Sequence, residues 1–280
     1  MPDEAPEIEA HGLTDTGPVR QDNQDAIRLS PADDGLAARH GHLYGIADGM
    51  GGFAHGGIAS ALALEVLFRS FYGLEGTPPH RLRKSVQDAN LGIYQMAARM
   101  GAGRMGTTLT AVHLSGHTLH VAHVGDSRAY LVRDRQATCL TQDHTRVGEL
   151  VRMRLLSPDK VRGHNQRSVL DKCLGLELFV QPDIFAVQVR PGDRIVLCTD
   201  GVWGFVEDEA IARIAAAEPG LEGFNRAMLA AAMEHGSDDN LSLLTLRFRS
   251  LAGPPQEGVP MKPIPLAIHS ILQSIRSILS

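Results

Sequence analysis

Four aspartates stand at the ends of segments with the apolar pattern of β-strands, and they are the side chains best suited to chemistry. Asp48 follows HLYGIA, Asp126 follows LHVAHVG, Asp200 follows IVLCT, and Asp239 precedes the segment that begins LSLLTLRF. In an antiparallel sheet the end of one strand lies beside the start of its neighbour, so these carboxylates can meet on one rim. Crowded carboxylates repel one another and tolerate the crowding best around cations. Oxygen donors without paired Cys or His favour hard metals, so the pattern predicts a Mg²⁺ or Mn²⁺ site.

The alternative for each aspartate taken singly is a structural turn, since Asp and Gly are both common turn residues. The neighbouring glycines favour the metal site. In Asp48-Gly-Met-Gly-Gly they allow a ligand to approach the backbone closely, and Asp200-Gly201 repeats the strand–Asp–Gly arrangement.

The elements that must position these residues follow from apolar periodicity. Residues 141–175 are charged and interrupt the pattern, which predicts an excursion from the sheet. The predicted strands are 42–47, 107–114, 118–124, 129–133, 184–189, 194–199 and 241–248. The predicted helices are 58–72, 80–100, 208–217 and 221–235.

The chain is expected to form one domain over residues 1–250, followed by a Pro-rich linker (251–265) and an amphipathic helix (266–280). The Ile and Leu face of that helix has three open roles: packing on its own domain, docking a partner, or touching a membrane surface.

Composition limits the classes of function. The 280 residues carry a net charge of −5, which argues against a protein that mainly holds nucleic-acid backbone. Three cysteines without a CxxC pair argue against a disulfide scaffold and a structural zinc site. The N-terminal residues lack an apolar signal segment, and no long apolar stretch predicts a membrane span, so a cytoplasmic location is expected.

Six short segments stand in order along the chain: TDTGPVRQDNQD (14–25), IADGMGG (46–52), MGTT (105–108), VGDSR (124–128), LCTDG (197–201) and DN (239–240). Together they resemble the motifs of the metal-dependent protein phosphatases of type 2C, the PPM family, in their bacterial form. The resemblance covers residues 11–248. It implies an α/β (α+β) fold, a four-layer αββα sandwich of two packed antiparallel sheets flanked by helix pairs.

The resemblance also implies a set of metal ligands. Asp48 would bridge two ions and the Gly49 carbonyl would bind one of them. Asp200 and Asp239 would complete the protein ligands of the other ion. Asp126, together with Asp200, matches the ligands of a third ion in bacterial members, although Asp126 has the alternative of stabilising its own turn.

Two further roles come from the resemblance. Arg20 is spaced as the phosphate-contacting arginine, with a plain surface arginine as the alternative. Asp25 would orient a water at the site, with a turn or cap residue as the alternative. Gln24 stands where some relatives have Glu, and Met50 stands where some eukaryotic members have a His proposed as general acid. No side chain is therefore identified as general acid, and residues 145–172 correspond to the flap of bacterial members.

The predicted function is hydrolysis of phosphoserine and phosphothreonine in proteins, through a hydroxide activated by two Mg²⁺ or Mn²⁺ ions. The expected partners are phosphorylated proteins, with a cognate Ser/Thr kinase acting in opposition. The alternative is a catalytically weak pseudophosphatase that binds phosphoproteins as a regulatory module.

Overall fold

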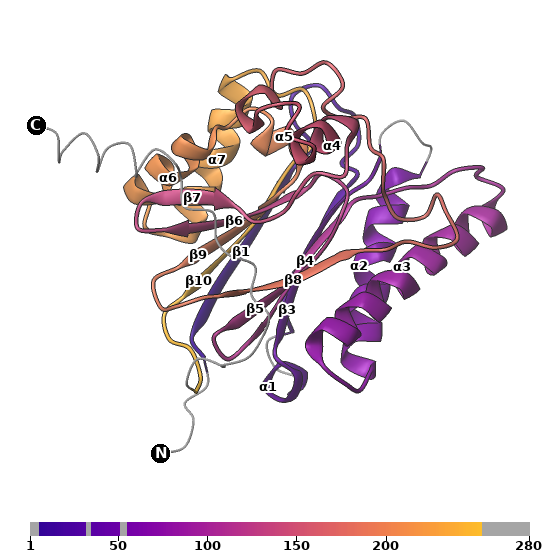
Figure 1. Cartoon of the computed structure of the whole chain (residues 1–280), viewed down its shortest axis with the longest axis horizontal. Coiled ribbons are helices and arrows are strands. Elements are labelled where there is room, and N and C mark those ends of the chain that lie inside the picture. The colour runs from indigo at the N-terminus through magenta and orange to yellow at the C-terminus, as the bar shows by residue number, and fades with distance from the viewer. Residues whose placement is uncertain (1–5, 32–34, 51–54, 254–280) are drawn as a thin grey trace, which may run out of the picture.

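The computed structural model describes residues 6–31, 35–50 and 55–253, within which ten strands form two five-stranded sheets (Figure 1). The first sheet contains, in spatial order, β1 (Ile8–Asp15), β10 (Leu241–Phe248), β9 (Arg194–Cys198), β6 (Arg128–Arg133) and β7 (Gln136–Cys139). The second contains β2 (Asp25–Arg28), β3 (His42–Asp48), β4 (Leu109–Ser115), β5 (Thr118–Val124) and β8 (Asp183–Gln188). Neighbouring strands are antiparallel in both sheets, so strand ends and strand starts alternate along each edge.

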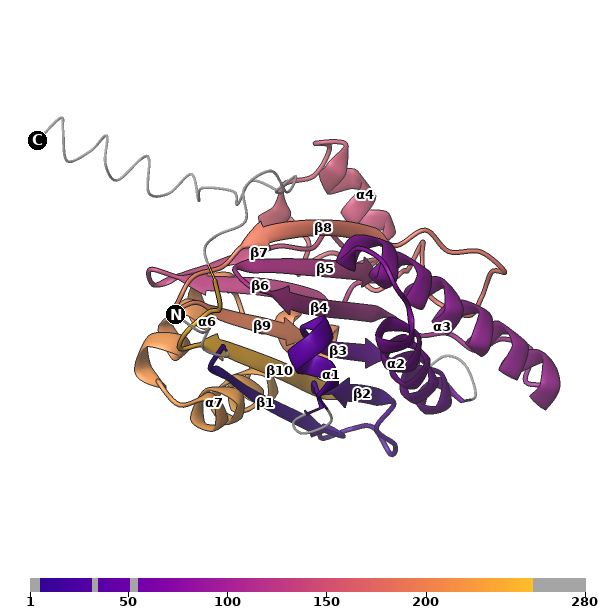
Figure 2. The same ribbon diagram turned by 90° about the horizontal axis from the view of Figure 1, so that it is seen from below.

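Helices cover the outer faces of the two packed sheets, which gives four layers (Figures 1 and 2). Helices α2 (Gly56–Gly73) and α3 (Pro78–Met100) lie on the second sheet, and α6 (Asp208–Ala217) and α7 (Leu221–Glu234) lie on the first. The shorter helix α1 (Leu36–His40) precedes β3, and the shorter helix α5 (Asp200–Trp203) follows β9. The predicted αββα sandwich is confirmed.

Strand β10 shows how the layers share one core. Leu244, Leu246 and Phe248 face the other sheet, whereas Leu241 and Leu243 pack towards the helices, and all five are fully buried. Successive side chains of a strand point to opposite faces, so this strand can contribute to two apolar layers at once. The nearly continuous apolar run is therefore explained by burial on both faces.

Apolar periodicity located most elements to within two residues. The predicted segments 118–124, 241–248 and 208–217 match β5, β10 and α6 residue for residue. The strand predicted from residue 107 begins only at Leu109, because Thr107 instead forms isolated bridges with Gly49 and Leu174.

Three strands were not predicted, and their lengths and sequences explain why. Strands β2 and β7 are four residues long, and β1 (IEAHGLTD) mixes polar with apolar residues. Strand β1 is identified only by its pairing with β10, in which Ile8 lies opposite Phe248 and Asp15 opposite Leu241.

Residues 141–175 leave the sheets and carry α4 (Arg146–Arg152) and a 3₁₀ helix (Pro158–Lys160). We call residues 145–172 the flap. Its two ends are joined by a bridge between Thr145 and Leu170 and by a 3.1 Å hydrogen bond from the Arg146 amide to the Val169 carbonyl. The flap therefore starts and ends at one place beside the sandwich.

The predicted linker lies outside the described residues except for 251–253, and the predicted helix 266–280 lies wholly outside them. None of the helices in the described part combines the length and the apolar character that crossing a bilayer would require.

Replacing Leu244 with Ala should lower the free energy of unfolding by about 2–5 kcal/mol, because a fully buried side chain between the sheets is deleted. Urea denaturation measures the loss. Leu155→Ala is the matched control: Leu155 is 71% exposed, so its truncation should change stability by no more than about 0.5 kcal/mol. Equal effects of the two substitutions would contradict the described core.

Candidate active site

The candidate site lies at one edge of the sandwich, where strand ends of both sheets meet. Asp25 at the start of β2 is directly opposite Asp48 at the end of β3. Asp200 follows β9, and Asp239 precedes β10 in the other sheet. The structure brings these aspartates close enough that each of Asp25, Asp200 and Asp239 acts electrostatically on Asp48.

The Asp48 backbone is fixed by two threonines of the segment before β4. The Thr108 hydroxyl lies 3.0 Å from the Asp48 amide, from which it accepts a hydrogen bond. The Thr107 hydroxyl and the Thr108 amide donate to the Asp48 carbonyl at 2.8 and 2.9 Å. Both threonines are buried, and in addition they position the central carboxylate.

Gly49 lies where the surrounding backbone leaves no room for a side chain. A Cβ atom at this position would lie 2.3 Å from the Gly56 carbonyl oxygen and 2.6 Å from that of Gln24. The Gly49 amide also donates to the Gln24 carbonyl at 3.1 Å. The close approach of three backbone segments explains the glycine, and it fixes the peptide that follows Asp48.

Burial and mutual repulsion raise the pKa values of the clustered carboxyl groups. Burial is the main cause for Asp48, followed by the charges of Asp25 and Asp200, and its pKa lies well above the usual value. The pKa of Asp200 is raised by burial and by Asp239. Burial also raises the pKa of Asp25 to about 7. Negative charge at this edge is thus destabilising unless a cation or a proton compensates it.

One oxygen of the Asp25 carboxylate forms a hydrogen bond and the other does not. The Thr199 hydroxyl donates to Asp25 Oδ2 at 3.0 Å, whereas Asp25 Oδ1 is buried without a hydrogen-bond partner. The buried Gln24 Oε1 also lacks a partner. Buried polar atoms in folded proteins are normally satisfied, so these two oxygens indicate water or cations at the site.

Arg20 and Asp239 form an ion pair, with Arg20 Nη2 2.8 Å from Asp239 Oδ2. Both side chains are partly exposed. The residue predicted to contact phosphate and a residue predicted to bind metal are therefore partners of each other. A cation that binds the Asp239 carboxylate has to compete with the Arg20 guanidinium.

Asn240 anchors the loop that carries Arg20, a role that the sequence analysis did not identify. Its amide nitrogen donates to the carbonyls of Thr16 and Asp22 at 2.8 and 3.0 Å, and its oxygen accepts from the Gln24 amide at 2.9 Å. Asn240 directly follows Asp239, and this proximity was the one signal available in the sequence.

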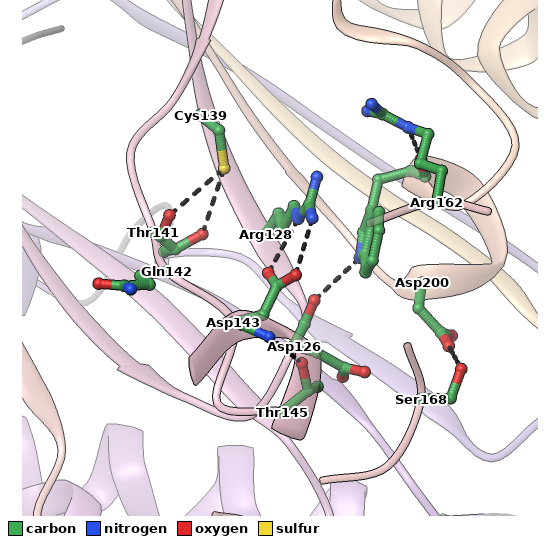
Figure 3. A network of polar contacts seen from close by, with 12 residues as sticks. Asp126, Arg128, Cys139, Thr141, Gln142, Asp143, Thr145, Arg162, Ser168 and Asp200 are labelled. Carbon is green, nitrogen blue, oxygen red and sulfur yellow. Dashed lines mark hydrogen bonds and ion pairs between the residues drawn. The ribbon is translucent and has the colours of Figure 1, made fainter. Parts of the chain in front are cut away.

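Asp126 is buried in the turn after β5, beside the other carboxylates. Its pKa is raised well above the usual value by burial and by Asp200. The Trp203 indole donates to the Asp126 carbonyl at 2.9 Å. From the flap, the Ser168 hydroxyl donates to Asp200 Oδ2 at 3.3 Å (Figure 3). The turn is therefore fixed from α5, and the flap reaches the carboxylate cluster.

A cavity of about 180 Å³ opens at this edge. Its lining residues are Arg20, Gln21, Asp22, Gln24, Asp48, Gly49, Asp239 and Asn240. In the part of the chain that the structure describes, no three His, Cys, Asp or Glu side chains are arranged to enclose an ion as they stand. The Arg20–Asp239 pair contributes to this, because it directs Asp239 towards the guanidinium. The oxygen-only donors and the two unpartnered buried oxygens nevertheless fit hard divalent cations.

The chain is similar to known proteins along most of its length. Residues 10–241 match the family model of protein phosphatase 2C. A putative protein phosphatase 2C-type of Streptococcus pyogenes is 32% identical over 241 residues, which cover 85% of this chain and 96% of that protein.

Two solved structures resemble it closely. The PPM Ser-Thr phosphatase MsPP of Mycobacterium smegmatis, in complex with cacodylate, has a TM-score of 0.74 at 34% identity, covering 85% of this chain and 97% of that one. The catalytic domain of the serine threonine protein phosphatase PstP, in complex with two manganese ions, has a TM-score of 0.72 at 29% identity, covering 86% and 98%.

The substitution Asp25→Asn should reduce the pH dependence of stability in the metal-free protein by the contribution of this one carboxyl group. The folded state holds the Asp25 proton up to about pH 7, whereas the unfolded chain releases it near the ordinary value of 3.8. The folded state therefore binds more protons in this window, and its free energy of unfolding falls as pH rises, by at most about 1.4 kcal/mol per pH unit. Urea denaturation in EDTA at pH 5, 6, 7 and 8 measures the slope.

Asp22→Asn is the control, since Asp22 lines the same cavity but is exposed. It should leave the slope as in the unsubstituted protein. A slope that Asp25→Asn does not change would show that Asp25 is ionised throughout this range.

Proposed function

Because the chain belongs to the protein phosphatase 2C family, we propose that it removes phosphate from phosphoserine and phosphothreonine in proteins, with two divalent cations bound at the carboxylate edge. At the level of class, it is a protein serine/threonine phosphatase, a metal-dependent hydrolase. One observation chiefly supports the binding of two cations. Carboxylates from the ends of four separate strands gather around Asp48, and burial and mutual repulsion raise the pKa values of Asp48 and Asp200.

The proposed ligands are those that the resemblance implies. Asp48 and the Gly49 carbonyl would hold one cation, and Asp48, Asp200 and Asp239 the other. Asp126 with Asp200 would hold a third. Manganese or magnesium is favoured because every donor is oxygen, and a related phosphatase was solved with two manganese ions. Such cations, when bound, lower the pKa of water and neutralise charge that develops on phosphate oxygens.

Arg20 would bind the substrate phosphate. Its planar guanidinium can offer two parallel donors to phosphoryl oxygens, a geometry that lysine cannot reproduce. In the structure it pairs with Asp239 instead. Arg20 would exchange this carboxylate for the phosphate when Asp239 serves as a metal ligand.

Asp25 would orient the water at the site. Its Oδ2 is held by Thr199, and its Oδ1, buried without a hydrogen-bond partner, would accept a hydrogen bond from that water. A pKa of about 7 would also allow Asp25 to hold or release a proton near neutral pH. Met50 supplies no proton, so the general acid stays without a candidate side chain.

The alternative of a weak pseudophosphatase gains no support from the comparisons, since the relatives described above are named phosphatases. The substrates are expected to be phosphoproteins. A cognate kinase and a cytoplasmic location both remain predictions from the sequence.

The protein should hydrolyse para-nitrophenyl phosphate only when Mn²⁺ or Mg²⁺ is added, and Asp48→Asn should lower kcat/KM by at least about 100-fold. Added Mn²⁺ should also raise the melting temperature of the unsubstituted protein and not that of the variant, because a ligand that binds the folded state stabilises it. Glu75→Gln, an exposed change between α2 and α3, should affect neither measurement. Equal activity with and without metal would refute the two-cation proposal.

Arg20→Lys should raise KM for a phosphothreonine peptide about tenfold, because one charge remains but the paired donors are lost. Steady-state kinetics over a range of peptide concentrations separate KM from kcat. The matched control is Arg69→Lys, which changes an exposed arginine paired with Glu65 on α2. If Arg20→Lys behaves like this control, Arg20 does not bind phosphate.

A further inference from the structure

His144 lies immediately before the flap and connects it to the turn after β5. Its backbone amide donates to the Gly125 carbonyl at 2.7 Å. Its backbone carbonyl accepts from the amide of Asp171, near the other end of the flap, at 2.9 Å. His144 is 8% exposed, so these hydrogen bonds are shielded from water. One buried residue therefore joins both ends of the flap to the turn that carries Asp126.

The His144 ring makes a second contact with Gly125. The Gly125 amide donates to His144 Nδ1 at 3.0 Å. Because Nδ1 accepts this hydrogen bond, the neutral ring carries its proton on Nε2. His144 Nε2 lies 3.2 Å from Oδ2 of Asp183, the first residue of β8. The hydrogen bond from His144 lowers the pKa of the Asp183 carboxyl to about 2, so Asp183 is ionised and accepts this proton. Asp183 therefore determines which ring nitrogen faces Gly125.

Two neighbours keep Asp183 and the ring in place. Lys172 Nζ lies 3.5 Å from Asp183 Oδ1 and donates to the Gln181 carbonyl at 3.1 Å. It also lies 3.3 Å from His144 Nε2, but two donors form no hydrogen bond, so the Asp183 carboxylate is the partner of both. The His123 ring stacks on the His144 ring, with 4.8 Å between the ring centres. The orientation of the His144 ring is thus fixed by packing as well as by hydrogen bonds.

The turn that His144 contacts has little freedom of its own. Gly125 has a φ of +107°, and a Cβ atom there would lie 2.6 Å from the Thr108 Cβ. Trp203 holds the carbonyl of Asp126, on the far side of the residue. His144 holds both the amide and the carbonyl of Gly125, and this carbonyl belongs to the peptide that leads into Asp126. The Asp126 backbone is therefore held from both sides.

From these contacts we propose that His144, oriented by Asp183, is a positioning residue for the Asp126 carboxylate and for the cation that Asp126 and Asp200 would share. The inference rests on the proposed function, because it concerns one of the proposed cation sites. It adds that the base of the flap and this cation site depend on one side chain. A displacement of the flap at His144 then moves the turn and weakens the site.

Two substitutions separate the roles of the two ring nitrogens. His144→Asn keeps an oxygen close to the position of Nδ1, so it can still accept from the Gly125 amide. His144→Gln keeps an amide group close to the position of Nε2, so it can still contact Asp183 but leaves the Gly125 amide without its acceptor. Both variants lose the imidazole, so the loss of packing is common to the two.

Binding of Mn²⁺ to the full chain, measured from the electron paramagnetic resonance signal of the free ion, is the first readout. His144→Gln should weaken the weakest Mn²⁺ site at least about fivefold. This is less than the roughly 10–100-fold typical of residues that bond directly to a metal ligand, because His144 acts through one peptide. His144→Asn should bind within about twofold of the unsubstituted protein, since it restores the acceptor.

Hydrogen exchange of the Gly125 amide in EDTA, followed by NMR, is the second readout and needs no cation. The amide should exchange at least about tenfold faster in the His144→Gln variant than in the His144→Asn variant, because only the latter keeps it hydrogen-bonded.

The matched control is His120→Gln, which removes another buried imidazole of the second sheet. His120 is 4% exposed and stacks on His113, with 6.0 Å between the ring centres. Its substitution should lower the free energy of unfolding but change neither Mn²⁺ binding nor the exchange of the Gly125 amide.

Asp183→Ala tests whether Asp183 acts through His144. It should weaken the same Mn²⁺ site about threefold in the unsubstituted protein and have no further effect in the His144→Gln variant, as expected for two residues that act in series.

The proposal is overturned if the Asn and Gln variants of His144 bind Mn²⁺ alike, or if His120→Gln weakens binding as much as His144→Gln does. An equal effect of Asp183→Ala in both backgrounds overturns the role of Asp183. If the unsubstituted protein binds no Mn²⁺, the two-cation proposal itself is refuted, and the exchange experiment still decides whether His144 holds the turn.

Discussion

Mutual repulsion among carboxylates at one edge of the sandwich is the interaction on which the rest of the structure depends. Asp25, Asp48, Asp126 and Asp200 are brought together, and burial and mutual charge raise the pKa of each. Such a cluster costs folding free energy unless cations or protons compensate it. Burial of apolar side chains between the two sheets and under the helices stabilises the fold and offsets this cost. Such a balance is expected where function requires a destabilising arrangement.

The frame around Asp48 limits how the cluster can respond. Thr107 and Thr108 hold the Asp48 backbone, and Asn240 holds the loop of Arg20 through three hydrogen bonds. Side chains can exchange partners within this frame while the backbone stays in place. The Arg20–Asp239 pair is the clearest case, because the two partners have different proposed roles, Arg20 as the phosphate contact and Asp239 as a metal ligand.

The flap is joined to this edge by specific contacts rather than by proximity alone. Immediately before the flap, the His144 ring accepts a hydrogen bond from the Gly125 amide at 3.0 Å, next to Asp126. The Ser168 hydroxyl contacts Asp200. On the other side of the same turn, Trp203 links Asp126 to the Arg128–Asp143 pair. This network ends at the main-chain carbonyl of Asp126, whose carboxylate belongs to the cluster at the candidate site.

The sequence by itself determined the family and, through that resemblance, the four layers, because the six motifs can be read directly along the chain. It also predicted the aspartates that meet, because apolar periodicity and strand-end residues are local properties of the chain. It also predicted β5, β10 and α6 to the residue. Tertiary structure alone decided the pairing of β1 with β10, the ion pair of Arg20 with Asp239, and the contact of Ser168 with Asp200. Each of these joins residues that are far apart in the chain, and no local pattern encodes which distant partner a polar or short segment will meet.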